Sequence, residues 1–120
     1  MCIRDRYITC CLLVHSFLLA TFSIVAVDTT TGEVGSAGGS CIAGSIIISD
    51  IHPGIGAIHT QSYYLQSNQN YASTLMNEGY SPLEIIQLLE ENDVQNNPSI
   101  RQYGIAVSYT HLTLPTTPYV

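Results

Sequence analysis

The chain has 120 residues, of which only 10% are charged, and its formal net charge is −6 at neutral pH. Between residues 7 and 106 the one strongly basic residue is Arg101, which stands against eight carboxylates. A surface of this kind repels phosphate, so the composition argues against binding to nucleic acid or to an anionic membrane surface.

The two ends of the chain are related through one DNA sequence. If residues 107–111 are written with the codons GTC TCT TAT ACA CAT, the reverse complement ATG TGT ATA AGA GAC encodes residues 1–5. This relationship resembles a translated sequencing adapter, and a chance inverted repeat is the alternative. We therefore predict that residues 1–6 and 107–120 are adapter-derived and that residues 107–120 pack against nothing.

Residues 7–20, YITCCLLVHSFLLA, resemble the apolar core of a signal peptide that lacks its basic start. Ala20 suits the position before a signal peptidase cut, so we expect an exported mature chain, periplasmic or extracellular, that begins at Thr21 and is not held in the membrane. Residues 8–27 are also long enough to span a membrane, so an uncleaved anchor stays open, as does a buried core segment. Cleavage would leave Cys41 as a single cysteine without an internal disulfide.

Residues 21–106 predict an α+β order of four short strands, two helices and a fifth strand. The first strand, residues 21–28, is a continuous apolar run, which predicts a strand buried on both faces. A Thr/Gly turn joins it to an antiparallel strand of small residues, 33–40. The stretch SIIIS within residues 41–50 predicts the third strand, and residues 56–61 predict the fourth.

The spacing of apolar residues then changes to that of a helix. Ser67 is predicted to cap a helix that runs to Asn77. Ser81 and Glu84 form a capping box that starts a second helix. Residues 101–106 predict the fifth strand. We expect both helices to lie on one face of the sheet that the first two strands form.

Several short motifs between Thr21 and Ala106 occur in combination, among them TFSIVAVDTTTGEVGSAGGS, GIGAIHTQSYY and SPLEIIQLLEENDVQ. Together they resemble the bacterial domain-of-unknown-function family 1028. The resemblance implies an N-terminal-nucleophile (Ntn) hydrolase-like fold, a four-layer αββα sandwich of which this chain holds the N-terminal part. It also implies a family in which some members are linked to cell-wall modules.

Thr21 is the candidate catalytic residue. A hydroxyl becomes a useful nucleophile when a base takes its proton, and a free α-amine has a pKa of about 7.7–8.0. Cleavage after Ala20 gives Thr21 both groups, whereas the alternative is an ordinary β-branched strand residue. Some Ntn hydrolases place a lysine near the nucleophile. Residues 7–106 contain none, so any positively charged helper would have to be Arg101 or lie in the missing C-terminal half of the domain.

Three residues that follow the fourth strand are the candidate substrate-binding residues. Thr60, Gln61 and Tyr63 offer a hydroxyl, an amide and an aromatic ring, which suit amide or sugar ligands. The alternative is a polar strand end with an exposed ring.

Two further groups of residues could serve other chemistry. Asp50, His52 and His59 have the spacing D-x-H-x6-H, which matches no familiar metal motif, so we expect isolated histidines, no metal and no cofactor. Cys41 with His52 or His59 could form a thiol dyad, but we expect a buried, inert cysteine.

The leading hypothesis is an exported Ntn-type amidohydrolase acting on an amide or peptide-like substrate, such as a small amide or a cell-wall fragment. The alternative is a non-catalytic cell-envelope or carbohydrate-binding module on the same fold. A free amine on Thr21 discriminates between them, because only the enzyme needs it. Assembly into a homo-oligomer is left open.

Overall fold

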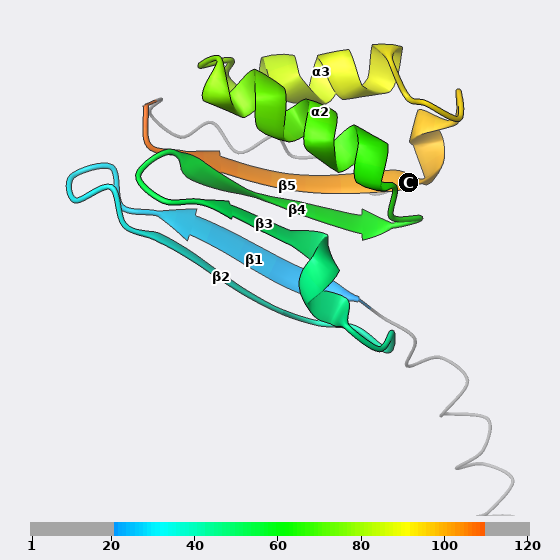
Figure 1. The fold of residues 1–120 in the computed structure, drawn as a ribbon, viewed down its shortest axis with the longest axis horizontal. Coiled ribbons are helices and arrows are strands. Elements are labelled where there is room, and N and C mark those ends of the chain that lie inside the picture. The colour runs from blue at the N-terminus through cyan, green and yellow to red at the C-terminus, as the bar shows by residue number, and fades with distance from the viewer. Residues whose placement is uncertain (1–20, 110–120) are drawn as a thin grey trace, which may run out of the picture.

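The computed structural model describes residues 21–109, in three layers (Figure 1). The predicted adapter segment 1–6, the predicted truncated signal peptide 7–20 and residues 110–120 lie outside that range. A two-stranded hairpin forms one outer layer, a three-stranded antiparallel sheet the middle layer, and two α-helices the other outer layer. The α+β class, the antiparallel pairing and the two helices agree with the prediction from sequence.

The hairpin consists of β1 (Phe22–Val27) and β2 (Val34–Gly39), which pair antiparallel as predicted. Asp28 holds the turn between the two strands through its side chain and its backbone. The Asp28 carboxylate accepts backbone N–H bonds from the two residues after Thr29, and its carbonyl oxygen accepts one from Gly32 at 2.8 Å. Gly32 has φ 74°, a conformation that residues with a side chain rarely adopt, which explains the glycine in the turn.

The third strand is shorter than the sequence predicts. Residues Ser45–Ile48 form a single 3-10 turn, η1, and β3 covers only Ser49–His52. Gly44, at φ 71°, turns the chain into η1. Of the three isoleucines in η1 only Ile48 is buried, and Ile46 is 78% exposed. A strand through SIIIS is therefore wrong, because the chain uses this stretch to pass from β2 to the edge of the middle sheet (Figure 1).

The middle sheet has β4 (Gly56–Ser62) at its centre, between β3 and β5 (Arg101–Val107). Both β3 and β5 run antiparallel to β4. Since side chains alternate along a strand, β4 turns Ile58 towards one outer layer and His59 towards the other. Both are buried.

The helices are α2 (Gln66–Asn77) and α3 (Pro82–Glu91), and they pack on β4 and β5. The capping box predicted for α3 is present, with the Ser81 hydroxyl accepting from the Glu84 backbone N–H. In α2 the capping position falls on Leu65 instead of Ser67, and no side chain caps the helix. Among residues 21–109, no helix has the length and apolar character needed to cross a membrane.

The apolar core lies between the helices and the middle sheet. It comprises Ile58, Ala72, Leu75, Met76, Ile85, Leu89, Ile105 and Val107. The prediction that the helices cover the β1–β2 sheet is wrong: they cover β4 and β5, and the hairpin packs on the opposite face of the same strands (Figure 1). The strand buried on both faces is β4, whereas alternate residues of β1 are exposed, so the prediction that the first strand is buried on both faces is wrong.

The end of β5 continues into the predicted adapter segment. Val107 pairs with Gly56 and is 3% exposed in the core. The Tyr109 hydroxyl lies within hydrogen-bonding distance of the carbonyl oxygens of Met76 and Tyr80, at 3.0 and 2.7 Å. The prediction that the chain packs against nothing from residue 107 onwards is therefore wrong for residues 107–109, because a β-branched residue at 107 fits the alternation of β5.

Candidate functional site

The space between the hairpin and the middle sheet, which we call the inter-sheet layer, contains hydroxyl and amide side chains that bond across it. Hydrogen bonds cross it in two places, from Ser23 on β1 to Gln61 on β4 and from Ser36 on β2 to Ser49 on β3. Hydroxyl and amide groups in this layer can bind each other or a ligand, which makes it the best candidate for a functional site.

Thr21 lies directly before β1, at one end of the inter-sheet layer. Its Oγ1 atom shares a hydrogen bond of 2.9 Å with the Ser40 hydroxyl. With its amide turned to satisfy both ends, Gln61 donates to the Thr21 carbonyl oxygen at 3.3 Å and accepts from the Ser23 backbone N–H at 3.0 Å. The fold therefore brings together two of the residues singled out from the sequence, Thr21 and Gln61.

The other two predicted substrate-binding residues lie elsewhere. Thr60 points to the helix-facing side of β4, where it is fully buried and its hydroxyl has no partner among the described residues. Tyr63 follows β4 with a side chain that is 67% exposed. Because neighbours on a strand face opposite ways, Thr60 and Gln61 do not share a cleft. Substrate binding by Thr60, Gln61 and Tyr63 stays a prediction.

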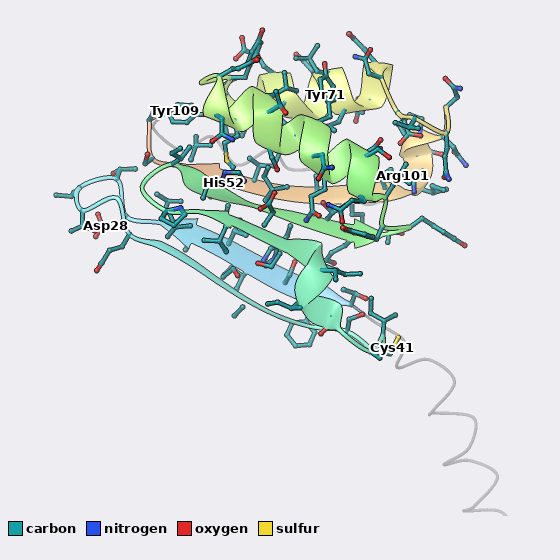
Figure 2. All side chains as sticks on the ribbon, in the orientation of Figure 1. Asp28, Cys41, His52, Tyr71, Arg101 and Tyr109 are labelled. Atoms are coloured by element: carbon teal, nitrogen blue, oxygen red, sulfur yellow. The ribbon has the colours of Figure 1, made fainter. Side chains whose placement is uncertain are left out.

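Arg101 is held in the helix-facing side of the molecule (Figure 2). Its Nε atom donates to Asp93 at 3.0 Å, Nη2 donates to Gln95 at 2.6 Å, and Nη1 donates to the Tyr63 carbonyl oxygen. The guanidinium and the backbone N–H of Asn97 hold the pKa of the Asp93 carboxyl well below its usual range. With these partners and this location, Arg101 is not a cation that could assist Thr21.

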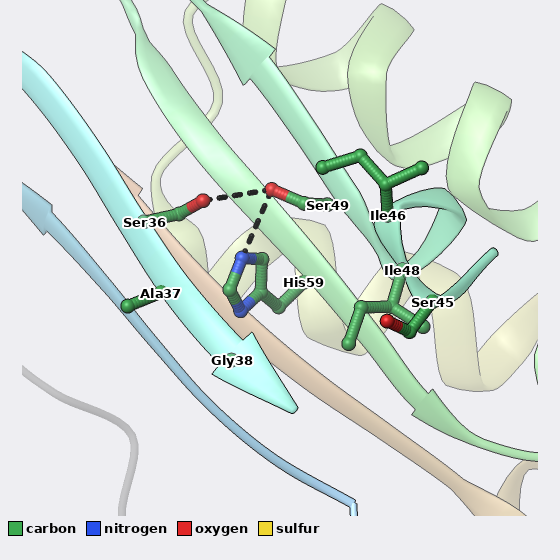
Figure 3. A pocket seen from close by; sticks show the side chains of 8 residues that line it. All are labelled: Ser36, Ala37, Gly38, Ser45, Ile46, Ile48, Ser49 and His59. Atoms are coloured by element: carbon green, nitrogen blue, oxygen red, sulfur yellow. Dashed lines mark hydrogen bonds between the residues drawn. The ribbon is translucent and has the colours of Figure 1, made fainter. Parts of the chain in front are cut away.

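A cleft of about 370 Å³ opens between β2 and the η1–β3 segment (Figure 3). His59, only 2% exposed, forms part of its wall. Its Nε2 atom lies 3.1 Å from the Ser49 hydroxyl, which lies 2.8 Å from the Ser36 hydroxyl. The Nδ1 atom is buried and has no partner among the described residues. Burial lowers the pKa of His59 below its ordinary 6.5, so the ring is neutral at neutral pH.

Sequence reasoning missed the serines around Thr21 and His59. The signal that could have found them is a spacing of two, which puts side chains on one face of a strand. Ser23 stands two positions after Thr21, and Ser40 stands four positions after Ser36 within the predicted small-residue strand. Serine is common in strands of small residues. This spacing therefore indicates a functional site only when the strand that faces it is known.

The weaker candidates do not assemble into a site. Asp50 lies 3.2 Å from His52, but His59 faces the opposite side of the sheet, bound to Ser49. Among residues 21–109 no three His, Cys, Asp or Glu side chains cluster closely enough to hold a metal ion. Cys41 is exposed at the end of the hairpin layer, so the expectation of a buried cysteine is wrong (Figure 2).

One family model matches the chain, over residues 21–114, and its description is "Family of unknown function (DUF1028)". The match begins at Thr21, the residue directly before β1, and continues past the predicted adapter boundary at residue 106. No curated protein and no solved structure matches the chain. Because the match covers well over half of the 120 residues, the chain belongs to the family of unknown function DUF1028.

Proposed function

We propose that the chain is the N-terminal part of an exported Ntn-type amidohydrolase, with Thr21 as nucleophile and the Thr21 α-amine as base. The observation that carries the proposal is the place of Thr21, which lies at the end of the inter-sheet layer, hydrogen-bonded to Ser40 and Gln61. The family match starts at the same residue, which agrees with a domain that begins there. The substrate is a small amide or a peptide-like fragment of the cell wall, and no cofactor takes part.

The layer order supports the Ntn-type fold within this proposal. Hairpin, sheet and helices correspond to three layers of an αββα sandwich. The outward face of β1 carries Phe22 and Ile24, which are 69% and 66% exposed. Large apolar side chains in a row on one strand face suit a covered position. A fourth layer of helices would cover them.

The proposed reaction has two steps. The Thr21 amine takes the proton from Oγ1, the oxygen attacks the substrate carbonyl carbon, and the departing amine leaves with that proton. Water then attacks the resulting Thr21 ester, again with the amine as base, and the carboxylic acid product leaves. Ser40 positions Oγ1 through the 2.9 Å hydrogen bond, and Gln61 fixes the backbone of Thr21.

The test compares four proteins made with their leader in a secreting host, after sequencing of the mature N-terminus. We expect Thr21 to be the first residue. Thr21→Ser should keep some activity on a panel of small amides, Thr21→Ala should have none, and a chain with one extra residue before Thr21 should lose about 10²–10⁴-fold, because its amine has become a non-basic amide. An extended chain as active as the wild type would rule out the amine as base.

We propose a second candidate function, which rests on one observation: the guanidinium of Arg101 is already bound to other residues. Among residues 21–109 it is the only strong base, and it is bound to Asp93 on the far side of the sheet from Thr21. A non-catalytic cell-envelope or carbohydrate-binding module needs no cation beside Thr21. Binding of cell-wall glycans by the Thr21→Ala variant, together with no turnover by any variant, would favour this module over the enzyme.

A further inference from the structure

The outer edge of β2 carries backbone groups without partners. Among residues 21–109, β2 pairs only with β1. In an antiparallel pair, successive residues turn their backbone groups alternately towards the partner strand and away from it. The Asp28 N–H donates to the Glu33 carbonyl oxygen at 2.8 Å, which sets this alternation along the hairpin. Ser36 and Gly38 therefore point their N–H and C=O groups to the open edge, where no described residue bonds them.

The opposite edge of the hairpin, on β1, is occupied near the start of the strand. Ser23 stands opposite Gly38, so by the same alternation its backbone groups point away from β2. There the side chain of Gln61 accepts from the Ser23 N–H at 3.0 Å and donates to the Thr21 carbonyl oxygen at 3.3 Å. The fold thus satisfies the edge of β1 at this end and leaves the edge of β2 available.

The edge of β2 also lacks the features that usually prevent a strand from pairing with another chain. Such features are charged residues, proline and bulges. The strand reads VGSAGG, with no charged residue and no proline, and its register with β1 runs without a bulge. Gly35 to Gly38 are all exposed. This edge is therefore accessible to an incoming strand.

The cleft of about 370 Å³ is lined by the same part of β2. Ser36, Ala37 and Gly38 form one side, and Ile46 and Ile48 of η1 belong to the other (Figure 3). Ile46 is 78% exposed, so an apolar side chain of a ligand could pack against it. The cleft therefore offers room for a side chain next to the unpaired backbone groups.

We propose that the β2 edge and this cleft bind an extended peptide, which adds to the hairpin as a third strand. Ser36 and Gly38 are two positions apart, or roughly 7 Å along a strand. An extended peptide presents an N–H and a C=O group on one side at the same interval, so it can pair with both residues. Its main chain supplies the hydrogen bonds, and a side chain enters the cleft.

The peptide site deepens the proposed function and rests on it in one respect, the identity of the peptide as substrate. Ser40, which bonds Oγ1 of Thr21, stands two residues beyond Gly38 in the chain. A peptide paired with Gly38 would therefore continue towards Thr21. The substrate would then be an extended peptide, held by its main chain on β2.

The test is an NMR titration of the ¹⁵N-labelled chain with acetyl-alanyl-valyl-alanine methylamide. The control is the same peptide with every backbone nitrogen methylated, which cannot donate a hydrogen bond. We expect only the unmethylated peptide to shift the backbone N–H resonances of Ser36 and Gly38, with those of Gly35 and Ala37, which face β1, as internal reference. Equal responses to both peptides, or no response to either, would overturn the proposal. Shifts that depend on protein concentration without peptide would show a second copy at this edge and also overturn it.

Two variants at residue 36 separate the backbone N–H from the hydroxyl. Both lack the hydroxyl that contacts Ser49, but only Ser36→Pro lacks the N–H, a loss that a strand edge tolerates. Ser36→Pro should bind the unmethylated peptide about 3- to 10-fold more weakly than Ser36→Ala, the effect of one hydrogen bond. Equal binding by the two folded variants would refute the pairing. If Ser36→Pro does not fold, the methylated peptide still decides the question on the wild type.

The titration needs no turnover, so the two proposals fail separately. Peptide binding at Ser36 and Gly38 without cleavage of any amide would support this site and count against catalysis by Thr21. Cleavage of amides without a response at Ser36 and Gly38 would support catalysis and overturn the site.

Discussion

The hydroxyl oxygen of Thr21 lies 2.9 Å from the hydroxyl oxygen of Ser40, a contact that joins the residue before β1 to the residue after β2. Because β1 and β2 pair along their whole length, the hairpin register sets this contact. Thr21 is thus restrained at both its side chain and, through Gln61, its carbonyl oxygen. Such restraint is what an N-terminal nucleophile would need.

The first prediction follows from this contact. Ser40→Ala removes the hydrogen-bond partner of Oγ1, so we expect kcat/KM on a responsive amide to fall about 3- to 10-fold. Stability should stay within about 0.5 kcal/mol, because the site is only partly buried. Ser99→Ala is the control, since Ser99 lies in η2 (Pro98–Ile100), remote from Thr21 in sequence and not bonded to it. Full activity of Ser40→Ala would show that the contact does not matter for the reaction.

The second prediction concerns acid stability. The folded protein lowers the pKa of Asp93 below its ordinary 3.8, so the stabilisation is fully present above that value and is lost as pH falls through the folded pKa. Urea unfolding between pH 6 and pH 2 should show this loss in the wild type. The Asp93→Asn variant should have a lower free energy of unfolding at pH 6, and that free energy should change less with pH. A wild-type profile with no steeper slope than that of Asp93→Asn would contradict the assignment.

The third prediction compares two serines that the sequence predicts to be helix caps. Ser81 caps α3 through the Glu84 backbone N–H, whereas Ser67 is not a cap in the structure. Ser81→Ala should lower the free energy of unfolding by about 1 kcal/mol. Ser67→Ala should change it by less than about 0.5 kcal/mol. Chemical denaturation of both variants measures the difference, and equal losses would mean that α2 begins where the sequence suggests.

The fourth prediction compares two glycines in strands. A Cβ atom on Gly56 would lie 2.2 Å from the Ala106 carbonyl oxygen, whereas one on Gly35 would meet nothing within 4 Å. Gly56→Ala should therefore destabilise the protein by about 1–3 kcal/mol or prevent folding. Gly35→Ala should be close to neutral, and thermal unfolding followed by circular dichroism compares the two. A stable Gly56→Ala protein would mean that β4 and β5 are farther apart than described.

Local signals in the sequence were sufficient for the elements that depend on neighbouring residues. The Thr/Gly turn predicts the β1–β2 hairpin because Gly32 allows the required backbone conformation, and Ser81 with Glu84 predicts the start of α3 because the two residues bond each other. Each of these interactions joins residues only a few positions apart, so the local sequence is sufficient to predict it.

The tertiary structure alone decided which faces meet. Alternation separates Thr60 from Gln61, but only the packing of the hairpin on β4 brings Gln61 to Thr21 and leaves Thr60 under the helices. The three isoleucines of η1 have the β-branched pattern of a strand, yet the route from β2 to the sheet edge requires a turn there. Contacts between segments far apart in the chain depend on the whole arrangement of layers, which no local pattern contains.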